Sequence, residues 1–143
     1  MMRPAQAQDV EQVRELLHEY AAGLDVDLSF QDFEAEFADP LKFYELVLLE
    51  EGGGCVAVRR IDHETCEMKR LYVRPAARGS GLGRRLAEAV IAEAGARGYR
   101  RMLLDTLPSM ASARALYAKL GFHETEPYRF NPIEGTTFLE LFL

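Results

Sequence analysis

Apolar residues recur with a helical period in the first 40 residues of the chain. Spacings of three and four predict a first helix, whose expected core face consists of Val10, Val13, Leu16, Leu17 and Tyr20. Residues 29–38 follow the same period and predict a second helix that ends before Pro40. Its aromatic positions are Phe30, Phe33 and Phe37. A very short strand near Arg3 is expected to precede both helices.

The middle of the chain contains shorter apolar runs that predict an antiparallel meander. The three expected strands span residues 43–49, 55–61 and 66–73. If the turn between the last two is centred on His63, Cys55 lies opposite Leu71 in the sheet.

The second half of the chain alternates between helical and strand patterns. A stripe at every fourth residue predicts a helix over residues 84–94, with Leu82, Leu86, Val90 and Ala94 on its buried side. Residues 101–106 predict a buried strand that lies parallel to strand 66–73 after a right-handed crossover. The remaining elements are a helix from Pro108 to Gly121 and a strand pair at 122–124 and 136–142.

The order of these elements predicts an α/β protein of the α+β type. We expect a single mixed, mostly antiparallel sheet of six to seven strands, flanked by about four helices, with a parallel pair at its centre.

Length and composition favour one globular domain over residues 1–143. Apolar residues make up 48% of the chain and charged residues 28%, as in ordinary soluble proteins. No run approaches the roughly 18 apolar residues that a membrane span needs, and the first residues do not resemble a signal peptide. We therefore expect a cytoplasmic protein without a membrane partner. A homodimer is compatible with this pattern.

Charge is unevenly distributed along the chain, whose net charge is −6. Residues 1–51 contain 13 acidic and three basic residues, whereas residues 59–101 contain 11 basic and five acidic residues. The basic half suits a polyanionic ligand, and the acidic half either favours a cationic acceptor or merely solvates helix surfaces. A pI near 5.1 and the lack of a basic stripe with interleaved aromatic residues argue against nucleic acid.

The cysteines and histidines predict no metal site. Cys55 and Cys66 are expected to be free thiols. The histidines are scattered singly and form no metal-ligand spacing with the cysteines.

The most informative segment is the loop 78–83, Arg-Gly-Ser-Gly-Leu-Gly, between strand 66–73 and the following helix. Its glycines let the backbone turn sharply and approach a ligand, and the free N–H groups and dipole of the helix start suit a phosphate. Gly83 lies two residues after Gly81 rather than three, which argues against a dinucleotide fingerprint. Arg84 stands where a nucleotide P-loop has lysine. A tight turn without a ligand is the alternative.

The pattern Arg78-x-x-Gly81-x-Gly83 after a strand resembles the coenzyme A pyrophosphate loop of the GNAT superfamily of acetyl-CoA-dependent N-acetyltransferases. The later segment 116–122, Leu-Tyr-Ala-Lys-Leu-Gly-Phe, and the order of the predicted elements resemble the same superfamily over nearly the whole chain. The resemblance implies the GNAT fold, in which the two parallel central strands splay apart. It also implies acetyl-CoA as the co-substrate and no metal.

The resemblance further implies two groups of coenzyme contacts. Backbone amides of the central strand would contact the pantetheine arm and the acetyl oxygen, at Leu71, Tyr72 and Val73. The loop and the helix start would bind the pyrophosphate, at Arg78, Gly79, Ser80, Gly81, Leu82, Gly83 and Arg84. One position departs from the family pattern, because Met110 stands where an asparagine commonly contacts the coenzyme.

Two catalytic roles follow from the same resemblance. Glu67 stands where some members place a general base. A glutamate of ordinary acidity is a poor base for an alkylammonium, so burial or a water relay must assist it; the alternative role is an ion pair with Lys69 or a neighbouring strand. Tyr117 matches the tyrosine that protonates the departing thiolate, and aromatic packing is its alternative role.

The expected reaction is direct transfer of an acetyl group to the primary amine of a small molecule or of an amino-acid or peptide acceptor. Neither cysteine stands at a nucleophile position. The candidate acceptor contacts are Phe30, Tyr128 and Asn131, although phenylalanines at helical spacing more often belong to a core. Two other functions stay open: a non-catalytic acyl-CoA-binding module on the same fold, and an unrelated nucleotide-binding domain.

Overall fold

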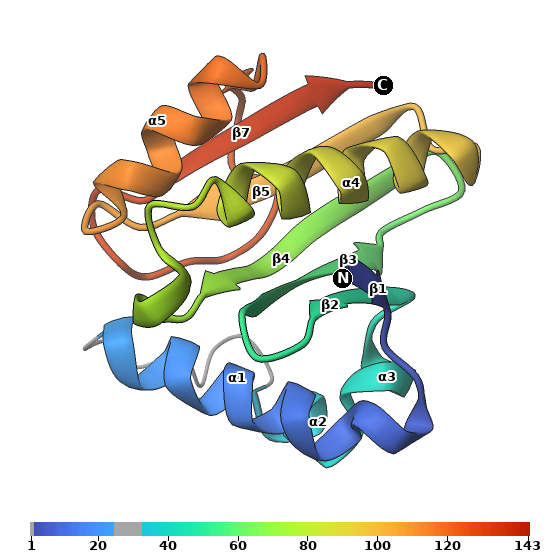
Figure 1. The fold of residues 1–143 in the computed structure, drawn as a ribbon. Coiled ribbons are helices and arrows are strands. Elements are labelled where there is room, and N and C mark those ends of the chain that lie inside the picture. The colour runs from blue at the N-terminus through green and yellow to red at the C-terminus, as the bar shows by residue number, and fades with distance from the viewer. Residues whose placement is uncertain (1, 25–32) are drawn as a thin grey trace.

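A seven-stranded mixed sheet with helices on both faces forms the fold (Figure 1). The computed structural model describes residues 2–24 and 33–143. The strand order is β1-β2-β3-β4-β5-β7-β6, and β4 and β5 form the parallel pair. The strands are β1 Met2–Pro4, β2 Leu46–Glu50, β3 Gly54–Arg60, β4 Thr65–Val73, β5 Arg101–Thr106, β6 His123–Glu124 and β7 Thr137–Phe142. The α-helices are α1 Val10–Leu24, α2 Phe33–Ala38, α3 Pro40–Phe43, α4 Leu82–Ala96 and α5 Ala111–Lys119.

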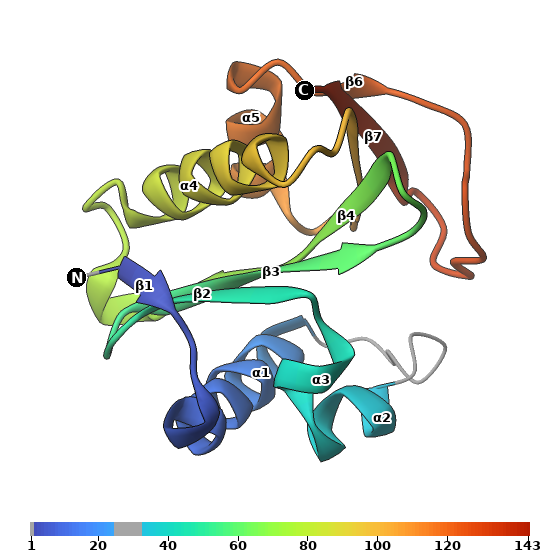
Figure 2. The same cartoon turned by 90° about the vertical axis from the view of Figure 1, so that its right-hand side faces the viewer.

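Two apolar cores lie on opposite faces of this sheet. Helices α4 and α5 cover one face, and α1, α2 and α3 cover the other (Figure 2). On the first face, Leu86 and Val90 of α4 belong to the same buried cluster as Val56 of β3. On the second, Leu16 of α1 packs in a cluster with Leu49 of β2. Within the described ranges, no helix has both the length and the apolarity that crossing a bilayer requires.

The fold class predicted from the sequence is confirmed, with one short helix more than expected. Helix α3 includes residue 43, where the sequence predicts the start of a strand, and β2 begins at Leu46 instead. The helix starts because Pro40 occupies its first turn and the Asp39 side chain accepts a hydrogen bond from the Lys42 backbone N–H. The predicted second helix is helical from Phe33 onward, and Phe30 lies outside the described residues.

The parallel strands β4 and β5 separate soon after they begin. They pair at three positions: Thr65 with Arg101, Cys66 with Met102 and Glu67 with Leu103. Strand β4 continues to Val73, whereas β5 pairs along its whole length with β7 on its other side. The edge of β4 beyond Glu67 is therefore left open toward β5. This confirms the splayed pair expected at the centre of the sheet.

A β-bulge interrupts β4 at the same place. Between the pairs Cys55–Tyr72 and Ala57–Lys69, β3 has one residue and β4 has two. One of the two is Arg70, whose φ of 57° is the positive value that a bulge residue can adopt. The predicted pairing of Cys55 with Leu71 is therefore wrong by one residue, because alternation along one strand does not reveal an inserted residue.

The start of β3 approaches β4 so closely that only glycine fits at position 54. A Cβ atom on Gly54 would lie 2.2 Å from the carbonyl oxygen of Tyr72. We expect Gly54→Ala to lower the free energy of unfolding by about 1–3 kcal/mol or more, measured by denaturant titration. Gly95→Ala, in open space on α4, is the control and is expected to raise stability by up to about 1 kcal/mol. Equal unfolding midpoints for the wild type and Gly54→Ala would contradict the steric argument.

Candidate active site

A cavity of about 480 Å³ occupies the gap between β4 and β5. Its walls come from both faces of the sheet, because Tyr20, Gly23 and Leu24 of α1 line it together with residues 109–113 and 116–117 around α5. Residues 68–73 of β4 and residues 104–105 of β5 lie between these two sets. The cavity therefore passes through the sheet where the parallel strands part.

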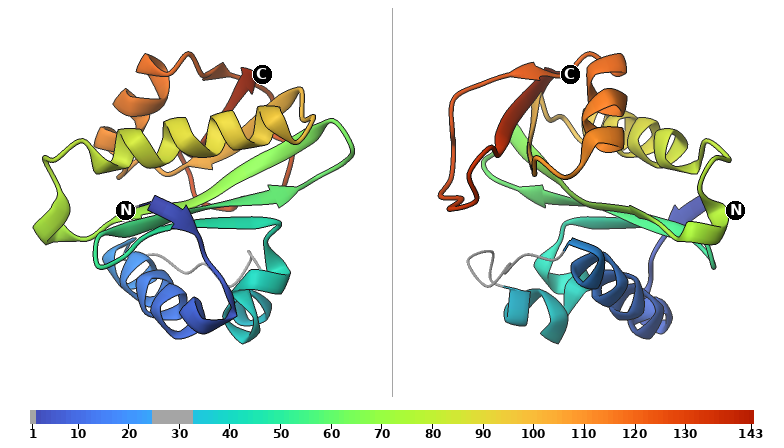
Figure 3. Two further views of the ribbon diagram at one scale, coloured as in Figure 1. Left: turned by 45° about the vertical axis from the view of Figure 1, so that its right-hand side comes forward. Right: turned by 90° about the vertical axis from the view of Figure 1, so that its left-hand side faces the viewer.

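The glycine loop leads directly to the N-terminus of α4 at the edge of this cavity. Gly79 and Gly81 have φ values of 82° and 81°, which a side chain would strain. Gly81 is the N-cap residue, and no side chain caps the first turn of α4, so its N–H groups stay available to an anion. Figure 3 shows the loop projecting beyond the helix at the end of the sheet.

The ten predicted coenzyme contacts occupy different places around the cavity. The structure places five of them in its lining: Leu71, Tyr72, Val73, Arg78 and Gly83. The other five lie in the loop and first turn without lining it: Gly79, Ser80, Gly81, Leu82 and Arg84. Among these, Ser80 donates its hydroxyl to the Ala77 carbonyl, and Leu82 is buried in the core. The Arg78 guanidinium donates to the Val73 carbonyl oxygen at 3.0 Å, which ties the loop to the end of β4.

Tyr117 lies in the cavity wall on the α5 side. Its side chain is buried and packs edge-on against the Phe122 ring at 5.6 Å between centroids. Burial raises the pKa of the Tyr117 phenol, so the group stays protonated at neutral pH. Met110 lines the same wall, and the Thr106 hydroxyl points to its sulfur at 3.7 Å. A thioether accepts hydrogen bonds only weakly, so Met110 cannot replace the two polar groups of an asparagine.

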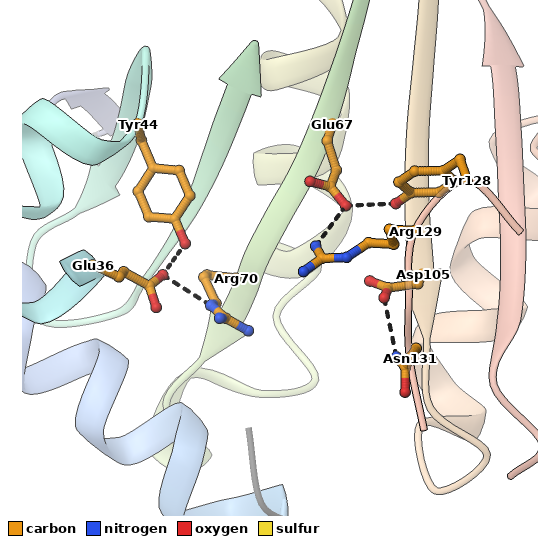
Figure 4. Close-up of polar contacts among 8 residues, drawn as sticks. All are labelled: Glu36, Tyr44, Glu67, Arg70, Asp105, Tyr128, Arg129 and Asn131. Atoms are coloured by element: carbon orange, nitrogen blue, oxygen red, sulfur yellow. Dashed lines mark hydrogen bonds and ion pairs between the residues drawn. The ribbon is translucent and has the colours of Figure 1, made fainter. Parts of the chain in front are cut away.

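Glu67 lies at the point where β4 and β5 part, but it does not line the cavity. Its carboxylate is 3% exposed and accepts hydrogen bonds from the Tyr128 hydroxyl at 2.5 Å and from the Arg129 guanidinium at 3.2 Å (Figure 4). Burial, followed by the nearby Glu67 charge, raises the pKa of Tyr128, so this phenol remains a donor. One ion-pair partner of Glu67 is therefore Arg129, which comes from the loop between β6 and β7.

The predicted acceptor residues Tyr128 and Asn131 lie outside the cavity lining, where each donates a hydrogen bond to a carboxylate. Tyr128 bonds to Glu67, and the Asn131 amide donates to Asp105 at 3.1 Å. Neither of the two lines the cavity. Both come from the loop between β6 and β7, which Figure 4 shows beside the end of β5.

Three charged residues in the cavity wall were missed by the sequence analysis: Lys69, Arg70 and Asp105. Burial lowers the pKa of Lys69 to about 8. Arg70 forms a buried ion pair with Glu36 of α2, with 2.9 Å between Nε and Oε2. Two adjacent cations within a strand expected to be buried were the available signal, because lysine and arginine are rarely fully buried unless they are paired.

The described residues hold no group of three or more His, Cys, Asp or Glu side chains that could bind a metal ion. The model of the acetyltransferase (GNAT) family matches residues 10–122, from the start of α1 to three residues past the end of α5. The chain belongs to the GNAT acetyltransferase family. It is therefore an acyltransferase, as the glycine loop and the element order indicate.

Relatives of this GNAT enzyme agree with that assignment. An N-acetyltransferase of Schizosaccharomyces pombe is 40% identical over 144 residues, which cover 94% of this chain and 88% of that protein. The IAA acetyltransferase of Azospirillum brasilense is 41% identical over 90 residues, which cover 61% of this chain and 58% of that protein. A Salmonella typhimurium acetyltransferase, solved with its cofactor acetyl-CoA, has a TM-score of 0.72 at 26% identity, covering 99% of this chain and 92% of that one.

Proposed function

We propose that this GNAT enzyme transfers an acetyl group from acetyl-CoA to the primary amine of a small-molecule, amino-acid or peptide acceptor. The transfer is direct, with both substrates bound at once. The observation that carries this proposal is the cavity through the β4–β5 gap, which Tyr117 lines and which has walls from both faces of the sheet. Such a cavity lets a donor and an acceptor meet from opposite sides.

The residues present fit the coenzyme. The uncapped first turn of α4 and the loop offer backbone N–H groups to the pyrophosphate, at Gly79, Ser80, Gly81, Leu82, Gly83 and Arg84. Arg78 and Arg84 add positive charge. The open edge of β4 from Leu71 to Val73 offers backbone groups to the pantetheine arm. The related Salmonella structure with acetyl-CoA supports the same donor.

Acetyl-CoA, when bound, supplies an acetyl group activated as a thioester. The acceptor amine must be neutral when its nitrogen forms the new C–N bond, and we assign removal of its proton to Glu67 through a water molecule, because the carboxylate lies behind the cavity wall. Tyr117 donates its hydroxyl proton to the sulfur as the C–S bond breaks. The nitrogen loses a second proton to solvent as it becomes an amide, and Tyr117 regains a proton from solvent. Its raised pKa keeps that proton available at neutral pH.

The cysteines support direct transfer rather than an acetylated enzyme. Cys55 and Cys66 are both free and buried, and neither lines the cavity. Burial raises the pKa of each thiol to about 12. The nucleophilic thiolate is therefore scarce at neutral pH.

The test of this function is a binding measurement followed by an activity measurement. Acetyl-CoA is expected to raise the melting temperature and to bind in calorimetry, whereas ATP is expected to do neither. Release of the coenzyme thiol should then depend on an added amine. Absence of acetyl-CoA binding would contradict the proposed function. Normal binding without amine-dependent thiol release would favour a non-catalytic acyl-CoA-binding module.

Glu67→Gln tests the proposed base. We expect kcat to fall by about 10²-fold or more, since the amide cannot accept a proton. Glu140→Gln is the matched control, because Glu140 is another buried glutamate, on β7, that forms an ion pair and does not line the cavity. Its effect on kcat should be much smaller. An unchanged kcat in Glu67→Gln would remove Glu67 from the mechanism.

A further inference from the structure

We propose that the acceptor amine carries a carboxylate, which the buried guanidinium of Arg70 holds inside the cavity. The acceptor is then a small amino acid or another amino carboxylate, rather than a simple amine or a polyamine. This inference rests on the proposed function, since it concerns the second substrate of the same cavity.

The bulge in β4 gives Arg70 its unusual position. Arg70 itself has the φ of 57° and lies in the bulge. In this position its side chain reaches Glu36 on the face of the sheet covered by α1 and α2, and Arg70 still lines the cavity. The guanidinium lies over the rings of Tyr20 and Phe33, at 5.3 Å and 5.1 Å from their centroids. These contacts fix its plane before any ligand binds.

The guanidinium has donor capacity that the protein leaves unused. The Arg70 side chain is 3% exposed. Its Nε donates to Glu36 and the guanidinium also interacts with the Tyr20 side chain, but Nη2 is buried and makes no hydrogen bond of good geometry among the residues that the structure describes. A buried donor without an acceptor is costly, so such a group indicates a missing partner. Figure 4 shows the guanidinium extending from the Glu36 side toward the gap between β4 and β5.

Carboxylate is the partner that this geometry favours. A guanidinium presents its N–H groups in a planar fork that matches the two oxygens of a carboxylate. Glu36 Oε1 is also buried without a hydrogen-bond partner within residues 2–24 and 33–143. Glu36 does not line the cavity, however, so a ligand there meets Arg70 rather than Glu36.

The charges around the cavity favour a zwitterion over a dication. Its charged lining residues are Lys69, Arg70, Arg78 and Asp105, so a single carboxylate stands among three cations in the part of the chain that the structure describes. A polyamine would bring a second positive charge beside Lys69 and Arg70, whereas a carboxylate is attracted to them. Asp105, held by Asn131, then faces the ammonium group of a zwitterion.

The test uses acceptor sets that differ only in the carboxylate. Free amino acids with small, apolar, acidic and basic side chains are compared with their carboxamides and with the corresponding decarboxylated amines. Activity is followed by coenzyme thiol release, and binding by thermal shift with and without coenzyme A. We expect at least one amino acid to exceed its carboxamide and amine by about 10²-fold or more in kcat/KM, because the alternatives leave the guanidinium unpaired.

Arg70→Lys identifies the residue responsible. It keeps a positive charge opposite Glu36 but loses the planar fork, so the preference for the carboxylate should fall by about tenfold or more while acetyl-CoA affinity stays within about twofold. Arg100→Lys makes the same substitution at an exposed position before β5, and its preference should match the wild type. The wild-type comparison decides the proposal even if Arg70→Lys does not fold.

Each result separates this inference from the proposed function. Equal use of amino acids, carboxamides and amines would overturn it, as would an unchanged preference in folded Arg70→Lys. Acetyl-CoA binding without binding or turnover of any carboxylate-bearing acceptor would overturn it and leave the coenzyme site standing. If acetyl-CoA failed to bind, the proposed function would be lost, and carboxylate-dependent thermal shifts in the free protein would still decide the role of Arg70.

Discussion

Tyr117→Phe is expected to lower kcat by about 10²-fold or more while the affinity for acetyl-CoA changes by less than about twofold. The phenol is the proton donor that we assign to the departing sulfur, and burial raises its pKa so that it carries the proton at neutral pH. Phenylalanine keeps the ring that packs against Phe122 and removes only the hydroxyl. The result would therefore separate proton donation from packing.

The measurement compares steady-state rates with the acetyl-CoA dissociation constant from calorimetry. Tyr99→Phe is a suitable control, because Tyr99 is a buried tyrosine whose hydroxyl bonds to Glu45 and which does not line the cavity. Its kcat should remain close to that of the wild type. If Tyr117→Phe reacted as fast as the wild type, the hydroxyl would have no part in the chemistry, and Tyr117 would serve only the core.

Gly81→Val is expected to weaken acetyl-CoA binding by about tenfold or more. Valine at the φ of 81° found there costs about 1–2 kcal/mol, and the backbone relieves this strain by moving the N–H groups of the loop. Each loss of about 1.4 kcal/mol in binding free energy corresponds to a tenfold rise in the dissociation constant.

A second glycine separates strain from coenzyme binding. Gly98, at the other end of α4, has a φ of 93° and no neighbour within 4 Å of an added Cβ atom, as is also true of Gly81. We expect Gly98→Val to lose comparable stability in denaturant titrations but to bind acetyl-CoA normally. Equal affinities in the two variants would show that the geometry of the loop does not control coenzyme binding.

Local patterns in the sequence predicted the elements around the coenzyme loop well. Strand β5 has the predicted bounds, and α4 extends the predicted helix by two residues at each end. Its apolar stripe predicted which side is buried, since Leu86 and Val90 are fully enclosed. Such features depend on neighbours three or four residues apart, which the sequence displays directly.

The acceptor side was less predictable because its contacts join distant parts of the chain. Arg70 enters the cavity wall through a bulge that is defined by the register with β3. Tyr128 reaches Glu67 across 61 positions, and Asn131 reaches Asp105 across 26. No periodicity encodes these pairings. The roles of Tyr128 and Asn131 as acceptor contacts therefore stay predictions, and Phe30 lies outside the described residues.

The short pairing between β4 and β5 connects the two halves of the sheet. The coenzyme loop connects β4 to α4, whereas Arg114 of α5 donates hydrogen bonds to the carbonyls of Thr106 at the end of β5, of Leu107 and of Gly135. The backbone pairing between these two halves of the sheet consists of the three residue pairs that Thr65, Cys66 and Glu67 form with β5. The spacing between Tyr117 and the loop therefore depends on these three pairs, none of which lines the cavity, and substitutions at them can change catalysis from a distance.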